Sequence, residues 1–297
     1  MKCLFCGSTQ LKLLFKEKFH PLAKWHGPFD LFQCGNCKSA LTIPLPDATQ
    51  LAKLYGSFTG GMMPQIRELR DEYPLHTWFN QCIDHALDAG HLKAKKSDVF
   101  SWIDFGAGNG ELSKSLMSRF PLSQGVAADF HDKPEMLAAT GIKWLKADLN
   151  DPLGASVSLL TKADYIFLIT VMEHLMRPDI FIGHALQLLK PGGCFYLTVP
   201  RIDCLAFTLL RQKWPYLIMG EHLNIPSIKG MEILLSNVCN GIFGEGHATI
   251  KVSPVVLPYP AGYYLQYFGM KRLAKKIPSD LVLKIPTGLL EASVVRR

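Results

Sequence analysis

The sequence predicts an α/β protein in which a small metal-bound module precedes a doubly wound parallel sheet. Short apolar segments alternate with helical segments over residues 99–199, as they do where helices connect parallel strands. Two cysteine pairs, Cys3-x-x-Cys6 and Cys34-x-x-Cys37, come before this region. The 297 residues, 48% of them hydrophobic, provide enough apolar surface for one large folded domain and a small one.

The two cysteine pairs predict a zinc ribbon over residues 1–46. Tetrahedral Zn²⁺ needs four soft ligands, and in a reducing compartment this spacing favours a metal over disulfides. The expected structural zinc ligands are Cys3, Cys6, Cys34 and Cys37. His20 and His26 lie between the pairs and are alternative ligands that the spacing leaves open.

Composition narrows the classes of protein to which the chain can belong. The sequence contains no stretch of roughly 18 continuous apolar residues, the length of a membrane span, and its first residues lack the apolar run of a signal peptide. We therefore expect a cytoplasmic protein. The formal net charge of +7 permits an anionic substrate but does not require nucleic acid.

The remaining elements follow in chain order. Residues 47–97 carry helical patterns and predict a helical linker or lid, and residues 98–297 predict the main α/β domain. The expected strands are Val99–Phe105, Gln124–Asp129, Ile142–Lys146, Ala163–Thr170, Cys194–Val199, Thr249–Val256 and Leu289–Arg296. The helices expected between them are Glu111–Arg119 and Pro178–Leu189, with a turn at Lys190–Gly193.

A C-terminal insertion over residues 260–286 separates the last two expected strands. Its segment Tyr263–Ile277 combines aromatic residues with lysines and an arginine. Three roles are open for this segment: it shapes an acceptor pocket, it touches an anionic membrane surface, or it is a solvated helix with one packed face.

A glycine-rich turn, Asp104-Phe-Gly-Ala-Gly-Asn-Gly110, follows the first strand and precedes a helix. Glycines at this place let the backbone pass close to a ligand. Asp129 ends the next strand, 21 residues after Gly108, where a carboxylate can accept hydrogen bonds from ribose hydroxyls. Asp148 ends the third strand, where it can contact an adenine amine.

The spacing of this turn argues against a dinucleotide. It is Gly-x-Gly-x-Gly and not Gly-x-Gly-x-x-Gly. Asp104 precedes the glycines, where an acidic group suits an amino-bearing ligand and opposes a pyrophosphate. S-adenosylmethionine, a sulfonium with an amino acid tail, fits this pattern better than a nicotinamide dinucleotide.

The run Asp104–Gly110, Asp129, Asp148 and the block Val171-Met-Glu-His-Leu…Leu-Leu-Lys-Pro-Gly-Gly193 resemble class I S-adenosylmethionine-dependent methyltransferases over about residues 99–200. This resemblance implies a Rossmann-like seven-stranded sheet that binds S-adenosylmethionine. It implies that Gly106, Ala107, Gly108 and Asn109 line the methionine and ribose part and that Asp129 holds the ribose. It also implies that Phe130, Asp148 and Leu149 lie at the adenine. Thr170 and Val171 are expected near the sulfonium.

Catalysis requires positioning of the nucleophile, and an oxygen or carbon nucleophile also requires a base, commonly a histidine. Two Glu-His pairs, Glu173-His174 and Glu221-His222, follow the fourth and fifth strands. The order of cysteine module, cofactor fold and second Glu-His pair is similar to that of zinc-containing sugar C-methyltransferases. That similarity implies His222 as the base and Glu221 as the residue that orients it. His174 is a further catalytic candidate. The alternative for each pair is a surface or helix-start position.

Three functions are compatible with these patterns. The favoured one is a methyltransferase acting at oxygen or carbon of a small-molecule acceptor, such as a sugar, glycolipid precursor or related metabolite. A zinc-ribbon RNA methyltransferase is the alternative, but residues 1–46 are poor in arginine and the lysines are scattered. A non-catalytic scaffold is disfavoured because the cofactor motifs are intact. The acceptor, the methylated atom and the oligomeric state are open.

Overall fold

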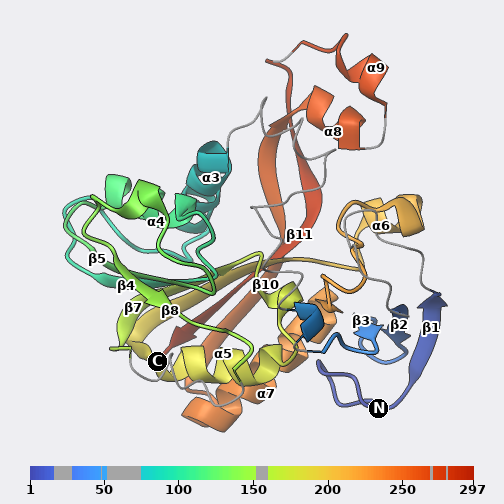
Figure 1. Ribbon diagram of the computed structural model, residues 1–297, viewed down its shortest axis with the longest axis horizontal. Helices are drawn as coiled ribbons and strands as arrows, with labels where there is room; N and C mark the ends of the chain where they lie inside the picture. The colour runs from blue at the N-terminus through green and yellow to red at the C-terminus, as the bar shows by residue number, and fades with distance from the viewer. Residues whose placement is uncertain (17–28, 48, 52–74, 152–159, 268–269, 279) are drawn as a thin grey trace.

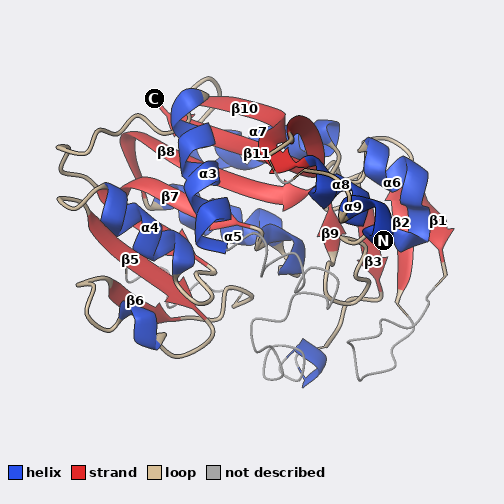
Figure 2. Ribbon diagram, turned by 90° about the horizontal axis from the view of Figure 1, so that it is seen from above, coloured by secondary structure: helices blue, strands red, loops and turns tan. Residues whose placement is uncertain are grey.

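The computed structural model describes residues 1–16, 29–47, 49–51, 75–151, 160–267, 270–278 and 280–297 (Figure 1). A central sheet lies between two layers of helices, and a small second sheet stands at one end, far from β6 at the other (Figure 2). The helices are α3 (Leu75–Asp88), α4 (Glu111–Arg119), α5 (Pro178–Gln187), α6 (Leu205–Leu210), α7 (Ile228–Phe243), α8 (Ala261–Tyr267) and α9 (Lys271–Ala274).

The central sheet has seven strands in the order β10-β11-β8-β7-β4-β5-β6. The five strands from β8 to β6 run parallel, and β11 and β10 pair antiparallel at one edge. This arrangement confirms the predicted Rossmann-like α/β class. The strands are β4 (Ser101–Phe105), β5 (Gln124–Asp129), β6 (Lys143–Lys146), β7 (Ala163–Ile169), β8 (Leu189–Pro200), β10 (Ala248–Pro260) and β11 (Val282–Arg296).

The side chains on the two faces of β4 show which helices cover each side of the central sheet. Side chains alternate across a strand, so Trp102 packs on one face with α3 and α4, whereas Ile103 and Phe105 pack on the other with α5 and α7. The chain moves from β4 to β5 on one side and later to β7 on the other. The carboxyl end of β4 is therefore the point where strand order reverses, at which open α/β sheets bind ligands.

The small sheet joins the cysteine module to the main domain. Strands β1 (Leu11–Phe15), β2 (Asp30–Cys34) and β3 (Ala40–Ile43) pair antiparallel in sequence order, and β9 (Asn224–Ile225) adds a fourth strand beside β3. Because β9 comes from the segment after β8, the two parts of the chain share one hydrogen-bonded sheet. This shared strand is not among the strands predicted from the sequence.

Several elements differ from their predicted bounds. Strand β8 begins at Leu189, and the expected turn at residues 190–193 is a bulge between the pairs Ala163–Leu189 and Tyr165–Cys194. Strands β10 and β11 extend into the expected insertion, because residues 256–260 and 282–286 pair with one another beyond the rest of the sheet. Residues 52–74, which belong to the predicted helical linker or lid, lie outside the described residues.

Helix α3 is a layer of the main fold. Its residues were predicted to belong to a linker or lid, whereas Ile83 and Ala86 are buried in the cluster that also holds Trp102 and Leu116. Within the described ranges, no helix has the length and apolar character that crossing a membrane requires.

A buried polar network ties α3 to the antiparallel edge of the sheet. The Glu291 carboxylate accepts hydrogen bonds from His85 Nε2 at 2.9 Å, Tyr196 Oη at 2.7 Å and Ser253 Oγ at 3.0 Å. Burial alone raises the pKa of Glu291, but hydrogen bonds from His85, His91 and Tyr196 outweigh it and lower that pKa to about 2. The hydrogen bond to Glu291 in turn raises the pKa of His85.

These pKa shifts predict how the network's contribution to stability depends on pH. The Glu291 contribution is present above the unfolded pKa of about 4.5 and is lost as the pH falls toward 2. The His85 contribution is present below its unfolded pKa of about 6.5 and is lost as the pH rises through the raised folded value. We expect Glu291→Gln to lower the free energy of unfolding by about 3 kcal/mol at pH 5 to 6 and to flatten its pH dependence. Urea unfolding across pH measures both, and Glu232→Gln on the exposed face of α7 is the control. If the free energy of unfolding of the Glu291 variant depends on pH as in the wild type, Glu291 does not contribute to stability in the way described.

Candidate functional site

The glycine turn stands at the carboxyl end of β4, directly against the end of β7. Gly106 has φ +72°, and a Cβ there would lie 2.3 Å from Val171 Cγ2. Gly108 has φ +53° with open space where its Cβ would be. Glycine is therefore required at Gly106 for close packing, and at Gly108 it permits the positive φ and leaves open space beside the backbone.

Asp129 closes this turn from the end of β5. Its Oδ2 accepts a 2.8 Å hydrogen bond from the Gly108 amide, and its Oδ1 accepts a 3.0 Å bond from the His131 amide and lies 2.9 Å from His131 Nδ1. A carboxylate has about four acceptor positions, so these bonds leave capacity for a ligand. The structure thus brings the turn and Asp129 together as the sequence led us to expect, and a ribose contact stays a prediction.

Asp104 lies beneath the turn. It is 2% exposed, and its Oδ2 accepts a 2.6 Å hydrogen bond from Ser113 Oγ on α4. Burial raises the pKa of this carboxyl to about 7, although the Ser113 hydrogen bond acts in the opposite direction. Asp104 therefore braces the first turn of α4, a role that the sequence analysis did not predict. Its expected contact with an amino group stays a prediction.

The residues predicted at the adenine end follow the neighbouring strands. Phe130 comes after β5 with 42% of its surface exposed, and its ring stands edge-on to His131 at 5.7 Å. Asp148 comes after β6, is exposed, and accepts a 2.8 Å hydrogen bond from the Asn150 amide. Leu149 packs against the core. All three stand at the carboxyl edge that holds the glycine turn.

The remaining predicted cofactor residues are in the turns that end β4 and β7. Thr170 has φ +52°, a left-handed conformation that is unfavourable for a β-branched residue and recurs at functional sites. The Ala107 amide donates to Ala128 at 3.1 Å, and Asn109 is exposed. Val171 packs on Gly106 of the glycine turn, and Glu173 follows Val171 by two residues. The glycine turn and Glu173 are therefore near one another.

Three ionisable side chains form a second cluster beyond this point. Ligand atoms of Glu173, His174 and His222 all lie within 4.8 Å of one another. The two histidine rings meet edge to face, with centroids 4.9 Å apart. Both Glu-His pairs predicted from the sequence thus converge on one place, although they are far apart in the chain. Glu173 was not among the predicted site residues, and its position in the first Glu-His pair was the available signal.

Backbone carbonyls orient both histidines. His174 Nδ1 donates to the Glu221 carbonyl at 3.2 Å, and His222 Nδ1 donates to the Tyr216 carbonyl at 2.7 Å. Because a carbonyl can only accept, each neutral ring carries its lone pair on Nε2. The expectation that Glu221 orients His222 is corrected here, since Tyr216 makes that contact and Glu221 instead holds His174 through its main chain.

Burial shifts the charge states of this cluster. It raises the pKa of Glu173 to about 8 and that of Glu221 to about 7, and it lowers the pKa of His174 to about 4. His174 is therefore neutral near pH 7, and Glu173 is mostly protonated. The Oε2 atom of Glu173 is fully buried and has no hydrogen-bond partner among the described residues. Groups that change protonation near neutral pH are suited to acid–base chemistry.

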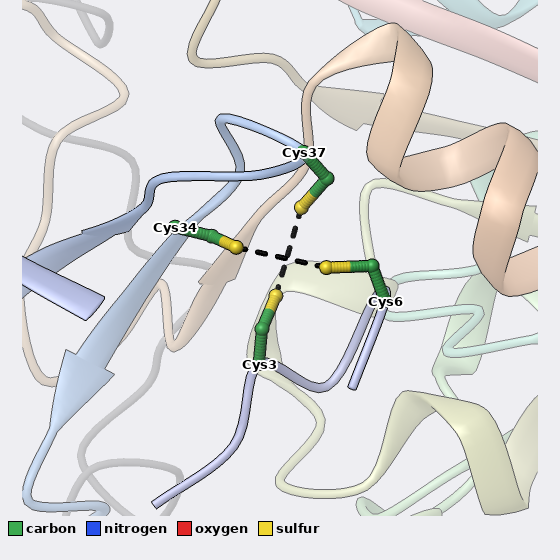
Figure 3. A group of neighbouring side chains, drawn as sticks. All are labelled: Cys3, Cys6, Cys34 and Cys37. Carbon is green, nitrogen blue, oxygen red and sulfur yellow. Dashed lines mark hydrogen bonds between the residues drawn. The ribbon is translucent and has the colours of Figure 1, made fainter. Parts of the chain in front are cut away.

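The four predicted cysteines converge in the small module (Figure 3). Cys3 and Cys37 have their sulfurs 3.6 Å apart, as do Cys6 and Cys34, and all four sulfurs lie within 4.8 Å of one another. Tetrahedral Zn²⁺ with Zn–S bonds of about 2.3 Å places its sulfurs about 3.8 Å apart. The four thiols therefore fit zinc. His20 and His26 lie outside the described residues.

The cysteine module contacts the histidine cluster through β3. Thr42 Oγ1 donates to the His222 carbonyl at 2.9 Å, and the Thr42 amide donates to the Leu223 carbonyl at 2.9 Å. The Leu223 amide donates to the Glu173 carbonyl at 2.6 Å. A continuous set of hydrogen bonds thus runs from the module to the main chain of His222 and of Glu173. No local sequence pattern indicates it, because these pairings join distant segments.

A cavity of about 550 Å³ lies elsewhere, beside Lys93, Asp164 and Gly192. It is at the amino edge of the parallel strands, opposite the glycine turn. Because ligands of open α/β sheets bind at the carboxyl edge, we assign the cavity no role in the chemistry.

Comparisons with known proteins agree with this geometry. Residues 75–238 match a family described as "Methyltransferase domain". No curated protein sequence matches the chain. A solved structure of the plantazolicin methyltransferase BpumL in complex with SAH (S-adenosylhomocysteine) is similar at 14% identity and a TM-score of 0.55, covering 83% of this chain and 94% of that one. A BpumL structure with a triazolic desmethylPZN analog and SAH is similar at 16% identity and a TM-score of 0.54, covering 83% and 95%.

Proposed function

Because this chain belongs to the methyltransferase-domain family, we propose that it transfers the methyl group of S-adenosylmethionine to an oxygen or carbon of a small-molecule acceptor. The observation that carries the proposal is the open glycine turn beside Asp129, joined through Val171 to the cluster of Glu173, His174 and His222. The glycine turn and Asp129, the donor half of the site, support binding of the methyl donor. The cluster of Glu173, His174 and His222, the acceptor half, supports removal of a proton from the acceptor.

The donor half is built for a nucleoside with an amino acid tail. Gly108 leaves open backbone surface, Asp129 has acceptor capacity for ribose hydroxyls, and Phe130 exposes an aromatic ring on which adenine can stack. When bound, S-adenosylmethionine supplies a methyl group already activated on a sulfonium. The similar BpumL structures contain SAH, which is consistent with this donor.

In the acceptor half, His222 is the proposed base. Its Nδ1 is bound to the Tyr216 carbonyl, so Nε2 receives the proton of the acceptor hydroxyl or carbon acid. The acceptor atom forms a bond to the methyl carbon as the sulfur–methyl bond breaks, and the electron pair of that bond stays on sulfur. His174, neutral and packed edge-on against His222, fixes the ring plane.

The acceptor class we propose is a sugar, glycolipid precursor or related metabolite. A zinc-ribbon RNA methyltransferase is the alternative, and salt-dependent binding of bulk RNA would favour it. We further propose that residues 1–46 are a structural zinc module. The methyltransferase domain then begins with α3, because that helix is part of the core and the family match starts at residue 75.

The test of the donor site is Asp129→Asn. We expect SAH to bind about 10- to 100-fold more weakly, because hydrogen bonds to a charged group contribute about 1.5–3 kcal/mol. Calorimetry with SAH measures the dissociation constant. Asp132→Asn, which changes a 90% exposed carboxylate three residues away, is the matched control. An Asp129 variant with the wild-type affinity, or a wild-type protein that binds no SAH, would overturn the proposal.

A further inference from the structure

The paired strands β10 and β11 carry their connection far beyond the sheet. Leu289 pairs with Pro200, the last residue of β8, and residues 282–288 continue past that point while β10 pairs with them up to Pro260. At about 3.4 Å per residue, this extension reaches about 20 Å. Helices α8 and α9 stand at its end, away from the body of the molecule (Figure 1). We call residues 270–278 and 280–285 the tip.

Apolar side chains are exposed on the tip. Between 42% and 50% of the surface of each is accessible, although aliphatic and thioether groups of this size are usually buried. They lie in or immediately before α9 and the first part of β11, and they are Met270, Leu273, Leu281, Val282 and Ile285. Exposed apolar groups that gather in one short segment are typical of interaction sites when they act together.

Basic side chains are interleaved with these apolar ones. All are exposed, and they are Lys271, Arg272, Lys275, Lys276 and Lys284. Asp280 is the acidic residue that the described part of the tip contains. Apolar groups beside lysines and arginine are the composition that binds at the interface of an anionic bilayer, where the apolar groups enter the acyl boundary and the charges meet lipid headgroups.

Two other occupants fit the tip less well. Single-stranded nucleic acid is held by exposed aromatic rings, but Tyr259 and Tyr263 stack on each other at 4.5 Å and the Tyr264 hydroxyl donates to the Ile285 carbonyl at 3.1 Å. The tip exposes aliphatic groups instead. A second copy of this chain would bring two like-charged tips together, which is unfavourable.

We propose that the tip docks on an anionic lipid bilayer, with Leu273, Leu281 and Val282 entering the interface and Lys275 and Lys276 contacting headgroups. The tip projects past the carboxyl end of β8, the edge that also holds the glycine turn and the histidine cluster. Docking therefore turns the ligand-binding edge of the sheet toward the bilayer. The inference does not depend on the proposed methyl transfer.

Sedimentation of the full chain with vesicles tests this docking. We expect it to bind vesicles of phosphatidylcholine mixed with phosphatidylglycerol, to release from them as salt increases, and not to bind pure phosphatidylcholine. Lys275→Glu with Lys276→Glu should weaken binding at least about 20-fold, since each basic residue near an anionic surface contributes about five-fold. Leu281→Asp with Val282→Asp should weaken it comparably while leaving SAH affinity unchanged.

The matched control is Lys95→Glu with Lys96→Glu, which reverses two exposed lysines just before β4, at the opposite edge of the sheet. It should bind vesicles within a few-fold of wild type. Equal loss in this control, equal binding to neutral and anionic vesicles, or unaltered binding after either tip substitution overturns the proposal. Stronger competition by bulk RNA than by anionic vesicles, or a dimer that the tip substitutions dissociate, also overturns it.

Discussion

Replacing His222 with glutamine should lower the rate of methyl transfer by about 10²- to 10⁴-fold, the usual contribution of a general base, and leave SAH affinity unchanged. Glutamine keeps a hydrogen-bonding side chain of similar length but cannot take up a proton near neutral pH. The side chain of His222 is buried at 6% exposure, so its removal acts on the site and not on a solvated surface.

The direction of the His222 ring makes this effect specific. With Nδ1 donating to the Tyr216 carbonyl at 2.7 Å, only Nε2 can act as the base. The ring is further confined by His174, whose own Nδ1 is bound to the carbonyl of Glu221, the residue just before His222. A base with a fixed tautomer and a fixed ring plane loses little entropy when the acceptor arrives.

Single-turnover methyl transfer to the authentic acceptor measures the rate, and calorimetry with SAH measures donor binding. His247→Gln, at an exposed position after α7, is the matched control and should keep the full rate. A His222→Gln enzyme with the wild-type rate removes His222 from the chemistry. A variant that loses rate and SAH affinity together indicates a structural role instead.

Local sequence patterns predicted the parts of the fold that depend on neighbouring residues. The strand, glycine turn and helix from Ser101 to Arg119 occur as expected, because apolar strand residues and the glycines of the turn impose them directly. Asp129 was placed correctly beside Gly108 because parallel strands end at a common edge. The four cysteines converge because their paired spacing leaves few alternatives.

The contacts that were missed join distant segments. Strand β9 pairs with β3 across about 180 residues, and two residues of extended chain carry no periodicity by which to predict such pairing. The carbonyl of Tyr216 that orients His222 is a main-chain group, and because every residue has one, the residue type does not predict this contact. Likewise, β10 and β11 were predicted only where they join the sheet, because their outer halves pair with each other alone.

Removal of zinc from the cysteine module should stop methyl transfer while SAH still binds. Wild-type protein should contain one zinc ion per chain, and Cys37→Ser should contain less. Strand β3 directly follows the turn that holds Cys37, and its first two residues, Ala40 and Leu41, pair with β9. Ser227, which caps α7, donates to the Cys37 carbonyl. Loss of the metal therefore removes the support that β3 gives to β9 and to the His222 segment, because zinc binding supplies much of the folding free energy of such modules.

Two measurements separate this effect from general unfolding. SAH affinity reports on the glycine turn and Asp129, which receive no hydrogen bond from β3 among the described contacts, and it should stay within a few-fold of wild type. Zinc content by mass spectrometry should be unchanged in Cys239→Ala, which alters a buried cysteine of α7 outside the cluster. Undiminished methyl transfer by zinc-free protein contradicts this coupling between the cysteine module and the His222 segment.

Thr42 tests the same coupling without removing the metal. Its hydroxyl donates to the His222 carbonyl at 2.9 Å, and Thr42→Val removes that donor at nearly constant volume. Loss of this buried hydrogen bond costs about 1 kcal/mol, and the His222 segment can shift as a result. We expect a lower maximal rate with normal zinc content and normal SAH affinity, and Thr42→Ser should restore the rate because it keeps the hydroxyl. If valine and serine at this position give the same rate, the module supports the fold alone and His222 is positioned by Tyr216 and His174.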